Sequence, residues 1–172
     1  MTLTVDLRRI SVQAVSPCRT VRAKATGTSG ITVEFGLTGL NGHDEQTLET
    51  AVRTAVNGAI TGYRKANAVV MERNQVTVSA RDDKDQILKR RNRIGEAVAE
   101  LTVRESSRFG HVDAKMSGRD GFAVRIRPGT LNLLRRDEAS MSAEINSAVT
   151  AVMRGYSKQL LSLRENGARN HG

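Results

Sequence analysis

Basic side chains are the residues of this sequence whose number and spacing point most directly to chemistry. The 172-residue chain has 27 lysines and arginines against 18 aspartates and glutamates, which gives a formal net charge of +9. An excess of this size is typical of proteins that bind a polyanion, above all nucleic acid. The alternative is a surface that is merely basic and solvated.

The basic residues that could contact phosphates fall into three groups. Four occupy about one turn of a predicted helix, where they spread around the axis because neighbouring residues are about 100° apart. Five lie on predicted strands, on the polar face opposite the core residues, and two precede the last predicted helix, whose start attracts anions. For the helix and the strands, a plain solvated surface is the alternative. The candidate nucleic-acid-binding residues are Lys89, Arg90, Arg91 and Arg93 on the helix, Arg22, Lys24, Lys115, Arg125 and Arg127 on the strands, and Arg135 and Arg136 before the last helix.

Patterns typical of catalytic or metal sites are missing from the sequence. His43, His111 and His171 are scattered, and no HxxxH, CxxC or paired-carboxylate spacing accompanies them. There is no P-loop, dinucleotide-binding glycine motif or nucleophile elbow. Cys18, the only cysteine, has no base near it in the sequence and cannot form an intramolecular disulfide, which favours a reducing compartment. We therefore expect a non-enzymatic protein with no cofactor, metal or small-molecule substrate.

The few aromatic residues separate the classes of nucleic-acid-binding protein. The chain has three Phe, two Tyr and no Trp. They are Phe35, Phe109, Phe122, Tyr63 and Tyr156, and four of the five fall on predicted core faces. Proteins that bind single strands stack bases on exposed rings, so this distribution favours contacts with the phosphates of duplex DNA. Such contacts have little sequence preference.

An internal repeat organises the chain. Residues 21–35 align with 112–126 at an offset of 91 (112 − 21), and residues 44–65 align with 137–158 at an offset of 93 (137 − 44). The identical pairs include Val21/Val112, Ala23/Ala114, Lys24/Lys115, Gly27/Gly118, Gly30/Gly121, Val33/Val124, Asp44/Asp137, Glu45/Glu138, Ala55/Ala148, Val56/Val149, Gly62/Gly155, Tyr63/Tyr156 and Lys65/Lys158.

Each copy is predicted to contain a β-hairpin followed by a long helix. Residues 21–26 and 31–35 alternate between apolar and polar, as half-buried strands do, and the glycines at 27 and 30 suit the turn between them. A phosphate-clamping GxxG loop of the KH type is disfavoured, because that loop joins helices. Asp44 and Asp137 are plausible N-caps of amphipathic helices that continue toward Arg73 and Leu163.

The segments outside the aligned parts differ between the copies. Residues 82–101 show a helical apolar stripe, followed by a strand at 101–104 that leads into the second hairpin. Copy one is expected to begin directly with a strand from Leu3 to Val15, without a preceding helix. Residues 75–80 fit a strand, a helix or a linker, and residues 165–172 read as a frayed polar tail.

The hairpin and helix of copy one are similar to a motif of the YbaB/EbfC family of bacterial nucleoid-associated proteins. The similarity covers most of residues 19–65 and, more weakly, 82–158. It implies small homodimers that bind DNA with little sequence preference, so two copies in one chain look like such a dimer fused into one polypeptide. Some actinobacterial relatives instead look like accessory proteins of type VII secretion. The matching residues are Ser29, Gly30 and Val33, then Leu48, Glu49, Val52, Ala55, Val56, Asn57 and Ala59.

We therefore expect an α+β fold in which two copies of a three-stranded antiparallel sheet plus long helix form a pseudo-dimer. The expected units are residues 1–74, residues 75–164 with the leading helix 82–101, and the tail 165–172. The start of the chain does not resemble a secretory signal, and no apolar run is long enough to span a membrane. The expected function is binding of duplex DNA in the cytoplasm, at the nucleoid, and the long helices could support a homo-oligomer. The alternative is a protein-interaction or type VII secretion accessory module that binds no nucleic acid.

Overall fold

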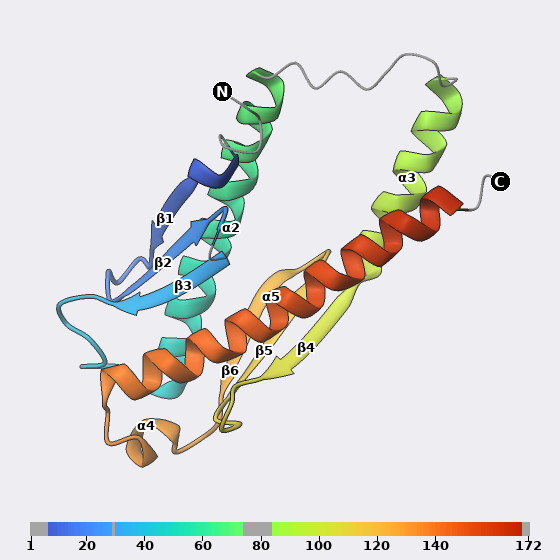
Figure 1. The fold of residues 1–172 in the computed structure, drawn as a ribbon. Helices are drawn as coiled ribbons and strands as arrows, with labels where there is room; N and C mark the ends of the chain where they lie inside the picture. The colour runs from blue at the N-terminus through green and yellow to red at the C-terminus, as the bar shows by residue number, and fades with distance from the viewer. Residues whose placement is uncertain (1–6, 29, 74–83, 170–172) are drawn as a thin grey trace.

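The computed structural model describes residues 7–28, 30–73 and 84–169, which form two three-stranded antiparallel sheets and the helices that follow them (Figure 1). The α+β class is confirmed. Sheet A, in the order β1-β2-β3, and its helix are β1 (Ser11–Val15), β2 (Val21–Thr26), β3 (Gly30–Phe35) and α2 (Glu45–Arg73). Sheet B, in the order β4-β5-β6, and its helices are α3 (Lys84–Glu100), β4 (Thr102–Ser106), β5 (Val112–Ser117), β6 (Gly121–Ile126), α4 (Thr130–Leu133) and α5 (Glu138–Arg169).

The internal repeat extends further in the structure than in the sequence alignment. All three strands of sheet B begin and end 91 residues after their counterparts in sheet A (102 − 11, 112 − 21 and 121 − 30), including the pair β1 and β4, whose sequences differ. α5 begins 93 residues after α2 (138 − 45). The two additional residues therefore lie between β6 and α5, in the connection that contains the short helix α4.

The start of copy one differs from the expected strand. Residues 7–9 form a helical turn, and β1 begins only at Ser11; the part of the predicted strand before Leu7 lies outside the described residues. The Gly27 N–H donates to the Ile10 carbonyl (3.2 Å), and 91 residues later the Gly118 N–H donates to the Leu101 carbonyl (2.9 Å). Copy one therefore begins with a single helical turn that is equivalent to the last turn of α3 in copy two. The expectation that no helix precedes copy one is wrong to this extent.

Glycine is required at positions 27 and 118 by this packing. A Cβ on Gly27 would overlap the carbonyl oxygen of Leu7, and one on Gly118 would overlap the carbonyl oxygen of Val98. Val98 lies 91 residues after Leu7 (98 − 7), so an equivalent helical turn packs against the equivalent glycine of each hairpin.

The long helices begin at the predicted caps. Asp44 accepts a hydrogen bond from the Thr47 N–H (2.7 Å), and Asp137 accepts one from the Ser140 N–H (2.8 Å). Hydrogen bonds from Thr47 and Ser140 hold the pKa of both carboxyl groups below the ordinary value of 3.8. α5 continues to Arg169, so residues 165–169 are helical where a frayed tail is expected. The predicted boundary between residues 74 and 75 lies outside the described residues, as do residues 75–80.

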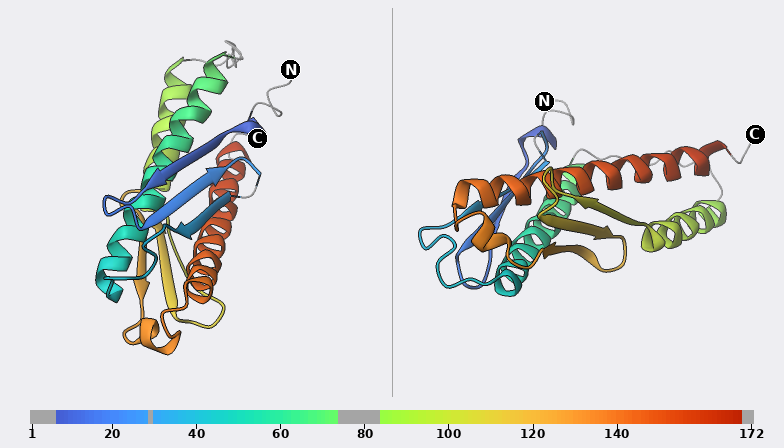
Figure 2. Two further views of the ribbon diagram at one scale, coloured as in Figure 1. Left: turned by 90° about the vertical axis from the view of Figure 1, so that its left-hand side faces the viewer. Right: turned by 90° about the horizontal axis from the view of Figure 1, so that it is seen from below.

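Each long helix packs on its own sheet and also reaches the edge strand of the other sheet. α2 contacts β1, β2 and β6, whereas α5 contacts β4, β5 and β3 (Figure 1). The buried apolar residues of both halves form one continuous core, which includes Val33 and Leu48 from the first half and Phe122 and Ile145 from the second. The C-terminal part of α5 lies beside α3, away from the sheets (Figure 2).

Polar side chains on the long helices bond to the free backbone groups of the edge strands. The Asn57 amide donates to the Phe122 carbonyl (2.8 Å) and accepts from its N–H (2.9 Å). Asn146 makes the same pair of bonds to Val33, at 2.8 and 2.7 Å. Glu49, two turns before Asn57, accepts from the Ile126 N–H (2.7 Å). The spacing matches because eight helical residues rise about 12 Å and four strand residues about 13 Å.

No helix among the described residues is both long enough and apolar enough to cross a membrane.

Candidate nucleic-acid interface

The predicted contact residues lie on several surfaces rather than one. Arg22 and Lys24 are exposed on β2, on the face of sheet A opposite α2. Lys115 on β5 and Arg125 on β6 lie on the face of sheet B opposite α5. On α3, Arg93 is exposed, whereas the side chains of the other three basic residues of its predicted cluster, Lys89, Arg90 and Arg91, lie outside what the structure describes.

The two arginines before α5 are held by the fold. Arg135 and Arg136 both have left-handed backbone conformations, with φ of 53° and 54°, which non-glycine residues rarely adopt. The Arg136 guanidinium donates to the carbonyl of His43 (3.1 Å) and so ties the loop before α2 to the start of α5. Arg135 and Arg136 are exposed beside that start, and the carboxylates of Asp137 and Glu138 lie there too, so charges of both signs meet at it.

The outer face of sheet B carries a group of cations on neighbouring strands. Arg104 on β4 lies directly opposite Lys115 on β5, and Arg125 lies on β6 opposite Asp113. These residues line an open hollow of about 710 Å³. Like charges placed directly opposite each other destabilise a sheet. The pair Arg104 and Lys115 therefore lowers the stability of sheet B.

Two of the cations on this face are partly neutralised and two are not. Lys115 forms an ion pair with Asp120 (3.7 Å), and Arg127, just beyond β6, forms one with Asp113 (3.7 Å). Both pairs are largely exposed, so they contribute little to stability and exchange readily. Arg104 and Arg125 are exposed and form no ion pair with any residue that the structure describes.

Arg104 is a functional candidate that the sequence analysis did not identify. It lies in the strand predicted before the second hairpin, and only the pairing of β4 with β5 places it beside Lys115. The sequence indicates this neighbourhood only indirectly, because the turn between Ser107 and Val112 fixes which residues of β4 and β5 face each other.

The outer face of sheet A is less basic at the same positions. Gln13 occupies the position of Arg104 (104 − 91), and Glu34 occupies that of Arg125 (125 − 91). Glu34 lies directly opposite Arg22, just as Asp113 lies directly opposite Arg125 in sheet B, so both sheets carry one acid–base pair at these positions, in reversed order. The outer face of sheet B is the more positive of the two because Arg104 replaces Gln13 and Arg127 replaces Gly36 (127 − 91).

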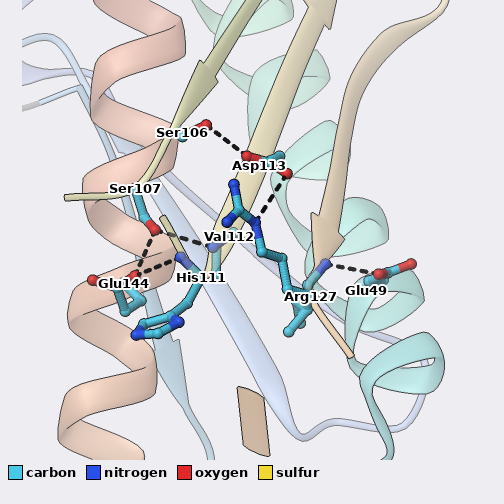
Figure 3. A network of polar contacts seen from close by, with 9 residues as sticks. Glu49, Ser106, Ser107, His111, Val112, Asp113, Arg127 and Glu144 are labelled. Atoms are coloured by element: carbon cyan, nitrogen blue, oxygen red, sulfur yellow. Dashed lines mark hydrogen bonds and ion pairs between the residues drawn. The ribbon is translucent and has the colours of Figure 1, made fainter. Parts of the chain in front are cut away.

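A polar network fixes the turn at one end of this basic face (Figure 3). Glu144 on α5 is only 4% exposed, and its carboxylate accepts hydrogen bonds from the Ser107 hydroxyl (2.5 Å) and the His111 N–H (3.3 Å). The Ser107 hydroxyl also accepts from the Val112 N–H (3.0 Å). The turn from Ser107 to His111 is thus bonded to α5 and does not depend on its own backbone alone.

The exposed cysteine is separated from the nearest buried histidine by a threonine. Cys18 lies 3.2 Å from the Ser16 hydroxyl and 2.9 Å from the Thr20 hydroxyl, which is itself 2.7 Å from the ring of His43. Burial raises the pKa of the Cys18 thiol, but the hydrogen bonds of Ser16 and Thr20 outweigh it and lower the pKa. Within the described part of the chain, no group of three or more His, Cys, Asp and Glu side chains could hold a metal ion.

The aromatic side chains lie as predicted. Phe122 and Tyr156 are buried in the core, and Phe35 and Tyr63 pack against it. Phe109, in the turn described above, is 70% exposed, with the Arg108 guanidinium 5.6 Å from the centre of its ring.

Comparisons of the chain with models of known protein families, with curated proteins and with solved structures found no match. The similarity to the YbaB/EbfC family therefore rests on the sequence motif alone and stays a hypothesis.

Proposed function

We propose that this chain binds duplex DNA through the outer face of sheet B and contacts phosphates with little sequence preference. One observation carries the proposal: Arg104 and Lys115 lie directly across two neighbouring strands, beside the exposed Arg125, in an open hollow. A bound phosphate backbone relieves the repulsion between these cations and uses the planar donors of the two arginines. Such contacts position a protein on DNA without reading bases.

At the level of the fold, we propose a pseudo-dimer of two YbaB-like units that acts without catalysis, in the cytoplasm at the nucleoid. The constant offset of the strands and the reciprocal contacts of α2 with β6 and of α5 with β3 support this proposal. Further self-association through the long helices belongs to the same hypothesis. The scarcity of exposed aromatic side chains supports duplex over single-stranded DNA.

The binding test is a titration of random-sequence duplex DNA, followed by fluorescence anisotropy at several salt concentrations. With about four to six phosphate contacts, the logarithm of the affinity should fall with the logarithm of salt at a slope of about −4 to −5. Absence of binding at low salt with micromolar protein would contradict the proposal and favour an acidic protein partner. Preferential binding of single strands would also contradict it.

The location of the site is tested with matched neutral variants. Arg104→Gln, Lys115→Gln and Arg125→Gln together should make the slope shallower by about 3, because three phosphate contacts are lost. The control variant, Arg154→Gln with Lys158→Gln, removes two exposed cations of α5 and should leave the slope nearly unchanged. If Arg22→Gln with Lys24→Gln instead produces the loss, the site lies on sheet A.

A further inference from the structure

We propose that Phe109 is a wedge that inserts between base pairs of the DNA held by sheet B and kinks the duplex. This inference rests on the proposed function and adds a second mode of contact, with the base stack rather than the phosphates. Architectural DNA-binding proteins use an apolar side chain in this way, with cations on either side to hold the backbone.

The position of Phe109 fits this role. Phe109 is 70% exposed, and the Arg108 guanidinium lies 5.6 Å from the centre of its ring. A Cβ built on the neighbouring Gly110 would lie 3.6 Å from the guanidinium of Arg127, which is ion-paired to Asp113 on the outer face of sheet B. An exposed aromatic side chain with a cation at its ring therefore lies in the turn that joins β4 and β5, the two strands that carry Arg104 and Lys115.

The turn that carries Phe109 is hydrogen-bonded to α5. Glu144 is buried and bonds to Ser107 and His111, and the Arg108 N–H donates to the Ser147 hydroxyl (2.9 Å). Burying a carboxylate is costly, and both described bonds of Glu144 go to this turn (Figure 3). A turn that is already fixed loses little conformational entropy when Phe109 inserts into the base stack, and this favours binding.

The other copy shows that the fold does not require this arrangement. The equivalent turn, Ser16 to Thr20, makes the same serine bond to the next strand (3.1 Å from the Val21 N–H). There, Cys18 occupies the place of Phe109 (109 − 91), and Ala51 occupies the place of Glu144 (144 − 93). Because the same turn forms without the aromatic ring and without the buried acid, we assign both to an interaction rather than to folding.

The experiment uses a duplex with a central TA step, which is easily unstacked. It carries 2-aminopurine beside that step and a donor–acceptor dye pair at its ends. The wild-type chain should raise the 2-aminopurine emission, as unstacking does, and increase energy transfer between the ends, as bending does. Phe109→Ala should lose both signals and bind about 5- to 150-fold more weakly, with the salt slope of the wild type. The matched control, Leu133→Ala, removes an apolar side chain of similar exposure (65%) and should keep both signals.

Each outcome decides the proposal. If the wild type binds DNA without either signal, or if Phe109→Ala retains both, the wedge is wrong while phosphate binding stands. If Phe109→Leu retains both signals, insertion holds but does not need an aromatic ring. If the wild type does not bind duplex DNA at low salt, the proposed function fails, and the wedge fails with it.

Discussion

At the scale of single residues, Asn57 and Asn146 each replace a missing neighbouring strand. An edge strand has free N–H and C=O groups that would otherwise pair with water or with another chain. A carboxamide presents one acceptor and a donor side by side, as the backbone of a paired strand does. Asn57 satisfies both groups of Phe122, and Asn146 satisfies both groups of Val33.

Replacing either asparagine should therefore destabilise the whole protein. We expect Asn57→Ala or Asn146→Ala to lower the free energy of unfolding by about 1–3 kcal/mol, since each leaves a partly buried donor and acceptor without partners. Urea denaturation followed by circular dichroism measures the change. The control Asn41→Ala, at an exposed loop position, should shift stability by no more than about 0.5 kcal/mol. Equal effects of the two classes of variant would show that the amide bonds are not important.

The sequence predicts residue roles only where the partner is close along the chain. Asp44 and Asp137 could be recognised as caps because each bonds three residues ahead. The role of Asn57 could not be recognised, because its partner Phe122 is 65 residues away. Arg104 was missed for the same physical reason, since its charge becomes important only when the strands pair.

At the scale of elements, two glycines set how closely the long helices approach the sheets. A Cβ on Gly62 of α2 would lie 2.6 Å from Cγ1 of Val12 on β1. The same atom on Gly155 of α5 would lie 2.9 Å from Cγ1 of Val103 on β4. The identity of these glycines in the two copies therefore reflects one packing contact that occurs twice.

Alanine substitutions should separate this packing role from the general effect of glycine in a helix. We expect Gly62→Ala and Gly155→Ala each to lower the free energy of unfolding by about 1 kcal/mol. Overpacking costs about 1–3 kcal/mol, and the better helix propensity offsets up to about 1 kcal/mol of it. Gly95→Ala in α3, where an added Cβ meets nothing within 4 Å, should instead raise stability by about 0.5–1 kcal/mol. Thermal unfolding measures all three, and stabilisation by Gly62→Ala would contradict the close contact.

Elements with a clear period were predictable, and those without one were not. The alternation at 21–26 and 31–35 and the stripe from Leu48 to Tyr63 each gave the element that the structure shows. At the start of the chain, alternation beginning at Leu3 favours a strand, but the chain turns at residues 7–9 to pass the hairpin glycine. α4 has only four residues, too few for any helical period to be visible.

At the scale of the whole molecule, the two halves share one core and bond across their edges. Neither sheet with its own helix buries its edge strand alone, because that strand is covered by the helix of the other half. We therefore expect a single cooperative unfolding transition, in which the calorimetric and van't Hoff enthalpies agree. Differential scanning calorimetry tests this expectation, and two resolved transitions would show that the halves fold independently. Asn57→Ala should lower the one transition without splitting it.

The difference between the two turns gives the molecule a direction. A dimer of identical chains repeats every substitution at two places, so its two ends remain alike. In this chain the strands have kept their positions, while one turn carries Cys18 and the other carries Phe109 supported by Glu144. The two ends of the molecule, here called head and tail, therefore differ in structure. When the molecule lies along a linear partner, the complex has a direction along that partner. Two molecules side by side on such a partner can meet head to tail, head to head or tail to tail, and these three arrangements are chemically distinct.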